Sequence, residues 1–512
     1  MPESRTKNSI RNIVVSIGMQ LTLLILSFIT RTVFIKLLGE NYLGITDLYS
    51  NILSILSLSD LGINTVMIYS LYKPLAENDK ETVRNLIIFF RKVYNIIAIV
   101  VFALGMFCVP FLQYIVKGSN LQLDQLRIYF ILFLLNTSFS YLNVYKSTLI
   151  NADQKLYIIK TVDFSASVLL NVGQIAILYI TRNYIFYLFL NIGITLAKNI
   201  TLSVVSDKRY PFLKNAKSTG VSSELKKQII QKTKSNFIYR VSAAIMNSTD
   251  NILISMILGT VIVGYYSNYL MIVTAINTFI MLIAQSLLAS IGNLNATADP
   301  KRKLLIFKSL VFVFWGIGTF CACCFLSMFN DFIGIWLKNY DTQYILPYRD
   351  VIAIAFNFFV GCVLTPIWMY RETSGLFSQV KYSMTVAAIL NIILSIILGR
   401  WIGLAGIILA TAISKILTNF WFEPKVLFSN VFDSSSLTYW LKVVKYILCS
   451  VLSVGVVMYV SSFIPPTIWG VGLKIIISFI ISVMVYICLN ANTEEEKYIF
   501  GTIKNLCRKR GN

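Results

Sequence analysis

The chain has 512 residues, of which 56% are hydrophobic and only 13% are charged, and its mean hydropathy is +0.71. A soluble domain carries about 25% charged residues, so this chain has too few charges to cover a water-facing surface. The composition excludes a soluble enzyme or nucleic-acid-binding domain and predicts an all-α polytopic membrane protein with no nucleic-acid partner. The net charge is +22. In a membrane protein, such a charge indicates an excess of Lys and Arg in the cytoplasmic loops.

Fourteen apolar runs are long enough to cross a membrane as helices, which takes about 20 residues. They lie at 12–36, 44–70, 93–116, 128–150, 158–180, 184–205, 237–258, 262–290, 306–329, 351–370, 381–399, 401–422, 441–463 and 469–490. The first run follows Arg5, Lys7 and Arg11 and is too long for the apolar core of a signal peptide. We therefore expect a retained first helix with its N-terminus inside.

The basic residues near the ends of these runs and between them predict how the chain crosses the membrane. With the N-terminus inside and fourteen crossings, 33 Lys and Arg residues fall in inside segments and eight in outside segments. Cytoplasmic loops are enriched in Lys and Arg, so this asymmetry favours a cytoplasmic location for both termini. Residues 206–236 are then a basic cytoplasmic linker that rests on anionic headgroups, and residues 491–512 form a cytoplasmic tail.

Several short motifs recur at a nearly constant offset, which predicts an internal repeat. Leu38-Gly39-x4-Gly44 recurs as Leu258-Gly259-x4-Gly264, Leu170-Asn171 as Leu390-Asn391, and Arg182 as Arg400, at offsets of 218 to 220 residues. Because each copy has six helices, both copies enter the membrane from the same side and the repeat is parallel. We expect one six-helix lobe at 1–205, a second at 237–422, and an additional helix pair at 441–490. Two lobes around a central cavity are typical of an alternating-access transporter.

Four stretches of the chain carry a resemblance to a known family. They are Arg31-Thr-Val-Phe-Ile-Lys-Leu-Leu-Gly-Glu-Asn-Tyr-Leu-Gly44, Ser57-Leu-Ser-Asp-Leu-Gly-Ile-Asn-Thr65, Asn268-Tyr-Leu with the later Asn293, and Gly403-Leu-Ala-Gly406. Over essentially its whole length, the chain resembles the polysaccharide transporter (O-antigen and capsule repeat-unit flippase) family of the multidrug/oligosaccharidyl-lipid/polysaccharide (MOP) superfamily.

The resemblance implies a multi-pass protein of the bacterial inner membrane and no enzyme activity. Its substrate would be an undecaprenyl-diphosphate-linked oligosaccharide repeat unit, flipped for the synthesis of O-antigen, capsule or exopolysaccharide. Membrane lipids, a polysaccharide polymerase and the chain-length machinery would be its partners, and H⁺ or Na⁺ would be a candidate coupling ion.

Charged side chains within the spans are the candidate site residues, because each costs about 2.5–3.5 kcal/mol at bilayer depth on insertion scales. By depth, Arg31, Asp47 and Asp250 are expected in the outer half of the membrane, and Asp60, Asp163 and Arg240 in the inner half. The resemblance implies that helices 1, 2, 7 and 8 line the cleft. The donor fork of arginine suits a diphosphate, so Arg240 would bind it when the cavity faces the cytoplasm and Arg31 when it faces outward.

These charges have an alternative, structural interpretation. Arg31 would then pair with Asp47 or Asp250, and Arg240 with Asp60, as ion pairs between helices. For all four aspartates, a structural or gating role is favoured over ion coupling. Lys198 and Lys415 lie near the ends of spans, where long side chains can reach the interface.

No resident cofactor or metal is expected. The chain has no histidine, and Cys321-x-Cys323-Cys324 has no second cluster with which to complete a zinc site. The chain contains no GxxxxGK[ST] motif, which excludes an ATP-driven pump in one chain. The remaining candidate energy sources for the export of a diphosphate are the membrane potential and an ion gradient.

Three other functions compete with this interpretation. A multidrug, cation-coupled exporter of the same superfamily usually has twelve helices, so the additional helix pair and the arginines argue against it. A peptidoglycan lipid-precursor flippase handles the same carrier lipid, so the sequence does not exclude this alternative. A membrane polymerase or glycosyltransferase would need a larger outer loop than the segment at about 330–350, or a cytoplasmic domain with paired carboxylates.

Overall fold

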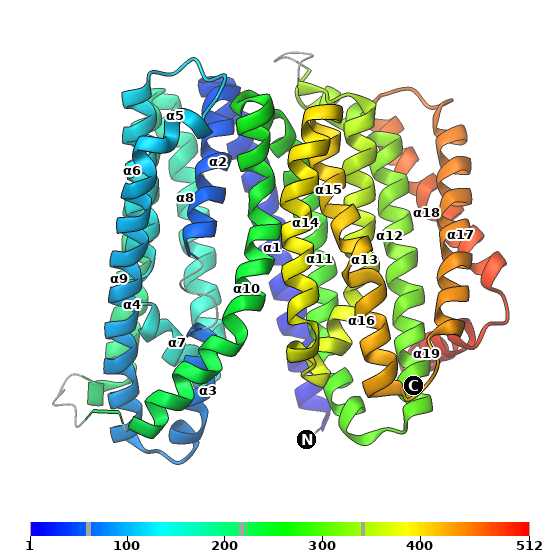
Figure 1. Ribbon diagram of the computed structural model, residues 1–512, viewed down its shortest axis with the longest axis horizontal. Coiled ribbons are helices and arrows are strands. Elements are labelled where there is room, and N and C mark those ends of the chain that lie inside the picture. Colours follow the sequence, from blue (N-terminus) through cyan, green and yellow to red (C-terminus); the bar gives the residue numbers. More distant parts are fainter. Residues whose placement is uncertain (1, 58–62, 214–219, 222, 339–343, 511–512) are drawn as a thin grey trace. The chain divides into compact units, whose positions relative to one another are not determined.

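The computed structural model describes residues 2–57, 63–213, 220–221, 223–338 and 344–510, and every regular element within these ranges is a helix. This confirms the predicted all-α fold class. The apolar runs of the sequence lie on long helices, whose backbone groups pair within the helix and need no water inside a bilayer. Each helix is labelled in Figure 1 where space permits.

The chain forms two compact units, one made of Met1–Ala244 with Gly259–Gly264 and the other of Ile245–Leu258 with Tyr265–Asn512. The first unit contains α1 (Pro2–Leu38), α2 (Glu40–Leu56), α3 (Ile63–Ala76), α4 (Lys80–Cys108), α5 (Leu112–Ile115), α6 (Leu123–Ser140), α7 (Val144–Ala152), α8 (Leu156–Thr181), α9 (Tyr184–Arg209) and the start of α10 (Ser223–Leu258). The second contains most of α11 (Thr260–Thr297), with α12 (Pro300–Trp336), α13 (Tyr348–Ser374), α14 (Phe377–Ile402), α15 (Leu404–Leu417), α16 (Asn419–Leu427), α17 (Leu437–Ser461), α18 (Ile468–Asn490) and α19 (Glu494–Arg510).

Eleven helices of the described residues are long and apolar enough to cross a membrane, or twelve if α6 and α7, which meet at 41°, make one span. The chain is therefore a multi-pass membrane protein. The predicted span 44–70 falls on α2 and α3, which have 17 and 14 residues on either side of the undescribed residues 58–62. The count of fourteen and the direction of crossing stay predictions.

The turn between α1 and α2 depends on glycine. Gly39 has φ +85°, and its repeat counterpart Gly259 has φ +104°, a region that other residues enter only with strain. Beyond these turns, a Cβ atom on Gly44 would lie 2.0 Å from the carbonyl oxygen of Thr260. One on Gly264 would lie 2.8 Å from the carbonyl oxygen of Glu40. The recurring Leu-Gly-x4-Gly motif thus combines a turn with a close approach of two helix backbones.

Hydrogen bonds between helices also follow the repeat. In the first unit, Thr30 on α1 donates to Asn171 on α8 at 2.8 Å. In the second, Thr249 on α10 donates to Asn391 on α14 at 3.4 Å. The two pairs differ by 219 and 220 residues, so equivalent polar side chains join equivalent helices in each unit.

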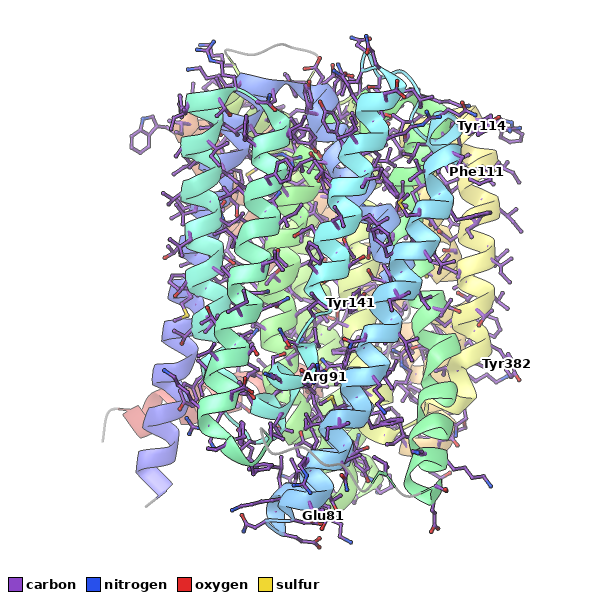
Figure 2. The ribbon with its side chains drawn as sticks, turned by 90° about the vertical axis from the view of Figure 1, so that its left-hand side faces the viewer. Glu81, Arg91, Phe111, Tyr114, Tyr141 and Tyr382 are labelled. Atoms are coloured by element: carbon purple, nitrogen blue, oxygen red, sulfur yellow. The ribbon has the colours of Figure 1, made fainter. Side chains whose placement is uncertain are left out.

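Helix α4 begins at a polar end, and exposed aromatic side chains follow its last residue on the next two short segments. Asp79 caps its first turn by accepting a hydrogen bond from the backbone N–H of Thr82 at 3.0 Å, and the hydrogen bonds from Thr82 lower the pKa of this carboxyl. Figure 2 shows Glu81 and Arg91 toward that end, and Phe111 and Tyr114 at the opposite end. Exposed aromatic side chains at the end of a span are typical of a membrane–water interface.

The turn between α7 and α8 is held by the carboxylate of Asp153, which accepts hydrogen bonds from Lys155 and, at 2.7 Å, from the Tyr210 hydroxyl. Burial alone would raise the pKa of Asp153, but these hydrogen bonds and the nearby cations outweigh burial and lower it. The charged carboxylate therefore stabilises the folded state above the usual carboxyl pKa. That contribution is lost as the pH falls through the lowered value.

The additional helices α17 and α18 pack against α12. Trp315 on α12 donates a hydrogen bond to Ser450 on α17 at 3.0 Å. Lys474 on α18 binds Asp331 on α12 at 2.5 Å and is 7% exposed. These polar contacts fix the helix pair to the second unit.

We predict that Gly44→Ala strongly lowers the stability of the protein, because the new methyl group would overlap the Thr260 carbonyl. Overpacking of this kind costs about 1–3 kcal/mol or more. The measurement is the apparent melting temperature of the purified protein in detergent. Gly193→Ala, at a helix position with no atom within 4 Å of the added methyl, is the matched control and should melt at or above the wild-type temperature. Equal melting of both variants would contradict the close packing.

Candidate functional site

Arg31 and Asp47 form an ion pair in the first unit. Arg31 lies eight residues before Gly39 and Asp47 eight residues after it, so the α1–α2 turn brings them to the same level. The Nη2 atom of Arg31 lies 3.2 Å from Oδ2 of Asp47, and the side chains are 16% and 26% exposed. The pair is thus partly buried but keeps an accessible surface.

Aromatic side chains lie beside this ion pair. Phe34, one turn after Arg31, makes edge contacts with the rings of Tyr184 and Tyr187 on α9. The hydroxyl groups of Tyr184 and Thr46 are hydrogen-bonded at 2.7 Å. Phe34, Tyr184 and Tyr187 are buried, so these rings pack α1 against α9 beside the ion pair.

Asp250 occupies the equivalent place in the second unit, 219 residues after Arg31. The Thr411 hydroxyl on α15 lies 3.1 Å from Oδ2 of Asp250, and Asn391 donates to Thr411 at 2.8 Å. Lys415, one turn further along α15, is close enough to interact electrostatically with Asp250. The repeat therefore places a cation of α1 in one unit and an anion of α10 at the matching position of the other.

The other predicted site residues have different surroundings. Asp163 on α8 pairs with Lys198 on α9 at 3.3 Å, and both side chains are over one-third exposed. Asp60 lies outside the described residues. Arg240 lies on α10, but its side chain is outside the part of the chain that the structure describes. The structure thus joins Arg31 with Asp47, and the predicted pair of Arg240 and Asp60 lies outside the part of the chain that it describes.

Sequence analysis missed a buried ion pair in the second unit. Arg371 on α13 lies 2.7 Å from Glu423 on α16, and the side chains are 5% and 4% exposed. Asn419 donates a second hydrogen bond to Glu423 at 2.7 Å. Arg371 was assigned to an inside loop, and Glu423 lay just past the predicted end of a span. The sequence did carry a signal for this ion pair, because the two opposite charges lie at the same end of two neighbouring spans.

The first unit has a comparable contact at α7 and α9. Lys146 donates hydrogen bonds to Asp207 at 2.8 Å and to Ser203 at 2.7 Å. Sequence analysis counted Lys146, near the end of the predicted span 128–150, among the inside basic residues and named no partner for it. Among the described residues, no group of three or more His, Cys, Asp or Glu side chains is placed to hold a metal ion.

The helical architecture and these membrane-embedded charges define a multi-pass membrane protein whose polar groups pair between helices. Residues 9–289 match the model of a family described as polysaccharide biosynthesis protein, and the chain belongs to that family. This match confirms the expected resemblance to a polysaccharide family. No match was found among curated proteins.

Solved structures share the fold. The chain is similar to one described as lipid II flippase MurJ in an inward closed conformation, with 17% identity and a TM-score of 0.66, covering 93% of this chain and 99% of that one. An inward-facing multidrug resistance MATE family transporter of the MOP superfamily has 13% identity and a TM-score of 0.56, covering 81% and 96%. A MOP superfamily transporter from Pyrococcus furiosus has 12% identity and a TM-score of 0.51, covering 81% and 94%. These solved structures, which are described as a flippase and as transporters, share the fold of the chain.

We predict that Glu423→Gln destabilises the protein by about 3–5 kcal/mol, because it removes the buried carboxylate nearest to the charge of Arg371 and leaves Glu372 at 4.0 Å. The double variant Arg371→Met with Glu423→Leu should recover most of this loss, since it removes both buried charges. Apparent melting temperatures in detergent measure the effect.

The matched control for this buried pair is Glu77→Gln. It breaks the exposed pair of Lys73 and Glu77 and should change stability by less than about 1 kcal/mol. A double variant no more stable than Glu423→Gln would show that burial of charge is not the cause of the loss.

Proposed function

We propose that the protein is a flippase that moves undecaprenyl-diphosphate-linked oligosaccharide repeat units across the bacterial inner membrane by alternating access. The product would serve O-antigen, capsule or exopolysaccharide synthesis, and the protein would act by transport and not by catalysis. Membership of a polysaccharide biosynthesis family over residues 9–289 is the observation that carries this proposal. Both termini would lie in the cytoplasm, as the distribution of basic residues favours.

Arg31 would bind the diphosphate in the outward-facing state. Its partner Asp47 would hold the guanidinium group in place while the site is empty, and would give it up to the more highly charged diphosphate. An arginine presents a planar fork of donors that binds two phosphate oxygens at once, which lysine cannot do. Arg240 would play the same role in the inward-facing state. Asp60, Asp163 and Asp250 would be gating or ion-coupling residues.

The membrane potential would supply part of the energy. Outward movement of about two negative charges gains about 4–5 kcal/mol per 100 mV if both charges cross the whole field. A proton or sodium gradient is the other candidate source. A polysaccharide polymerase and the chain-length machinery would take up the flipped unit.

Two alternatives have support in the comparisons. A structure described as a lipid II flippase covers 93% of the chain, which favours a peptidoglycan-precursor flippase as the second candidate. Multidrug resistance transporters share the fold with 81% coverage, which keeps a multidrug or cation-coupled exporter as the third.

Deletion of the gene, followed by mass spectrometry of carrier-linked glycans on each face of the inner membrane, separates the three functions. We expect undecaprenyl-diphosphate repeat units to accumulate on the cytoplasmic face while surface polysaccharide is lost. Accumulation of the peptidoglycan precursor would instead favour the second function. A normal glycan distribution with new sensitivity to cationic drugs would favour the exporter.

We predict that Arg31→Ala and Arg240→Ala each abolish export in cells that lack the wild-type gene, whereas Arg31→Lys retains only part of it. Arg302→Ala, which removes an exposed arginine on the first turn of α12, is the control and should export normally. Surface polysaccharide is the readout, and immunoblots of membranes verify equal protein levels. Full export by both alanine variants would refute binding of the diphosphate by these arginines.

A further inference from the structure

A basic pocket lies where α17, α18 and α19 meet. It has a volume of about 340 Å³ and is lined by Thr438, Leu441, Lys442, Lys445, Tyr446, Asn490 and Thr493. Figure 1 shows α19 at the end of the second unit where α17 begins. The pocket belongs to helices beyond the predicted repeat and contains none of the residues proposed to bind the transported diphosphate.

Lys442 is held in the pocket by a buried carboxylate. Its ammonium group binds Glu495 on α19, which has no exposed surface. The other carboxylate oxygen of Glu495 has no hydrogen-bond partner among the described residues. Lys308 on α12 is close enough to interact electrostatically with Lys442 and with Glu495, so two cations share this one buried anion.

Lys445 supplies a positive charge that the described residues do not pair. It is exposed, and no carboxylate of the described residues lies within the ion-pair distance of 4.0 Å. The residues that line the pocket include two lysines and no carboxylate, while Glu494, Glu495 and Glu496 lie on the first turn of α19. The first turn of α17 carries no acidic residue, and the N-terminal end of a helix itself favours an anion. The hydroxyl groups of Thr438 and Thr493 add donors for phosphate oxygens.

The surface next to Lys445 is apolar and suits acyl chains. Leu441, Lys445 and Leu448 lie on one face of α17, at spacings of four and three residues. Leu441 is 65% exposed and Leu448 is 64% exposed. In a span of a membrane protein, such a face is covered by lipid. The cations therefore lie at the end of a lipid-facing stripe, where the headgroup of a lipid would be found.

We propose that this pocket binds the headgroup of an anionic glycerophospholipid of the cytoplasmic leaflet. Its phosphate lies between Lys445 and the hydroxyl groups of Thr438 and Thr493, and its chains lie along Leu441 and Leu448. The excess of positive charge favours an anionic headgroup over a zwitterionic one. The bound lipid fixes α17 and α19 to the membrane and is a structural partner distinct from the transported molecule.

Native mass spectrometry of the full-length purified protein tests this site, with dioleoylphosphatidylglycerol and dioleoylphosphatidylcholine as probes. Wild-type protein should retain the phosphatidylglycerol in preference to the phosphatidylcholine. Lys445→Gln should reduce the retained phosphatidylglycerol about fivefold, and Lys445→Glu should reduce it further, because each basic residue near the surface adds about this much affinity. Melting temperatures without added lipid verify that both variants fold.

Lys301→Gln is the matched control, because Lys301 is an exposed lysine at the start of α12, away from the pocket lining. It should bind phosphatidylglycerol like the wild type. Equal retention of the two lipids, or no effect of either Lys445 variant, would overturn the proposal. Retention of undecaprenyl diphosphate but not phosphatidylglycerol, lost in Lys445→Gln, would also overturn it and would identify a substrate site. None of these measurements requires transport, so the lipid site and the flippase function can each fail its test independently of the other.

Discussion

The fold depends on one constraint, which is that polar groups inside the hydrocarbon region must find partners between helices. Water is absent there, so an unpaired charge or backbone group costs several kcal/mol. The chain meets this constraint locally, within each unit. Arg31 with Asp47 joins α1 to α2, Lys146 with Asp207 joins α7 to α9, and Arg371 with Glu423 joins α13 to α16. Each of these three ion pairs therefore joins helices of the same unit.

The internal repeat explains why these contacts recur and where they differ. Thr30 with Asn171 and Thr249 with Asn391 are the same hydrogen bond in the two units. The next residue breaks the symmetry, because Arg31 follows Thr30 whereas Asp250 follows Thr249. A symmetric scaffold thus carries opposite charges at matching positions. If the protein carries an anionic group, as proposed, the side chain that attracts it is Arg31 in the first unit, and the matching position of the second unit holds an anion.

The sequence predicts the helices well because apolar runs and helical spans obey the same length rule. It also identifies Gly44 and Gly264, since a repeated glycine indicates a place where a side chain would not fit. Periodicity does not reveal partners that are distant in the chain. Lys198 and Lys415 were assigned to the interface by their position near the ends of spans, yet each has a carboxylate nearby in Asp163 and Asp250. Arg371 was counted as a loop residue, because composition alone cannot show that Glu423 lies beside it.

Exposure separates the ion pairs that only hold helices together from those that can exchange partners. Arg371 and Glu423 are 5% and 4% exposed, and a third residue, Asn419, completes the hydrogen bonding of the carboxylate. A ligand cannot reach that pair without opening the helix packing. Arg31 and Asp47 are 16% and 26% exposed and share a single contact of 3.2 Å between them. Under the proposed function, a diphosphate would approach from this accessible side and replace Asp47 without first exposing a buried charge. Exposure is therefore the physical reason why the proposal assigns ligand binding to Arg31 and not to Arg371.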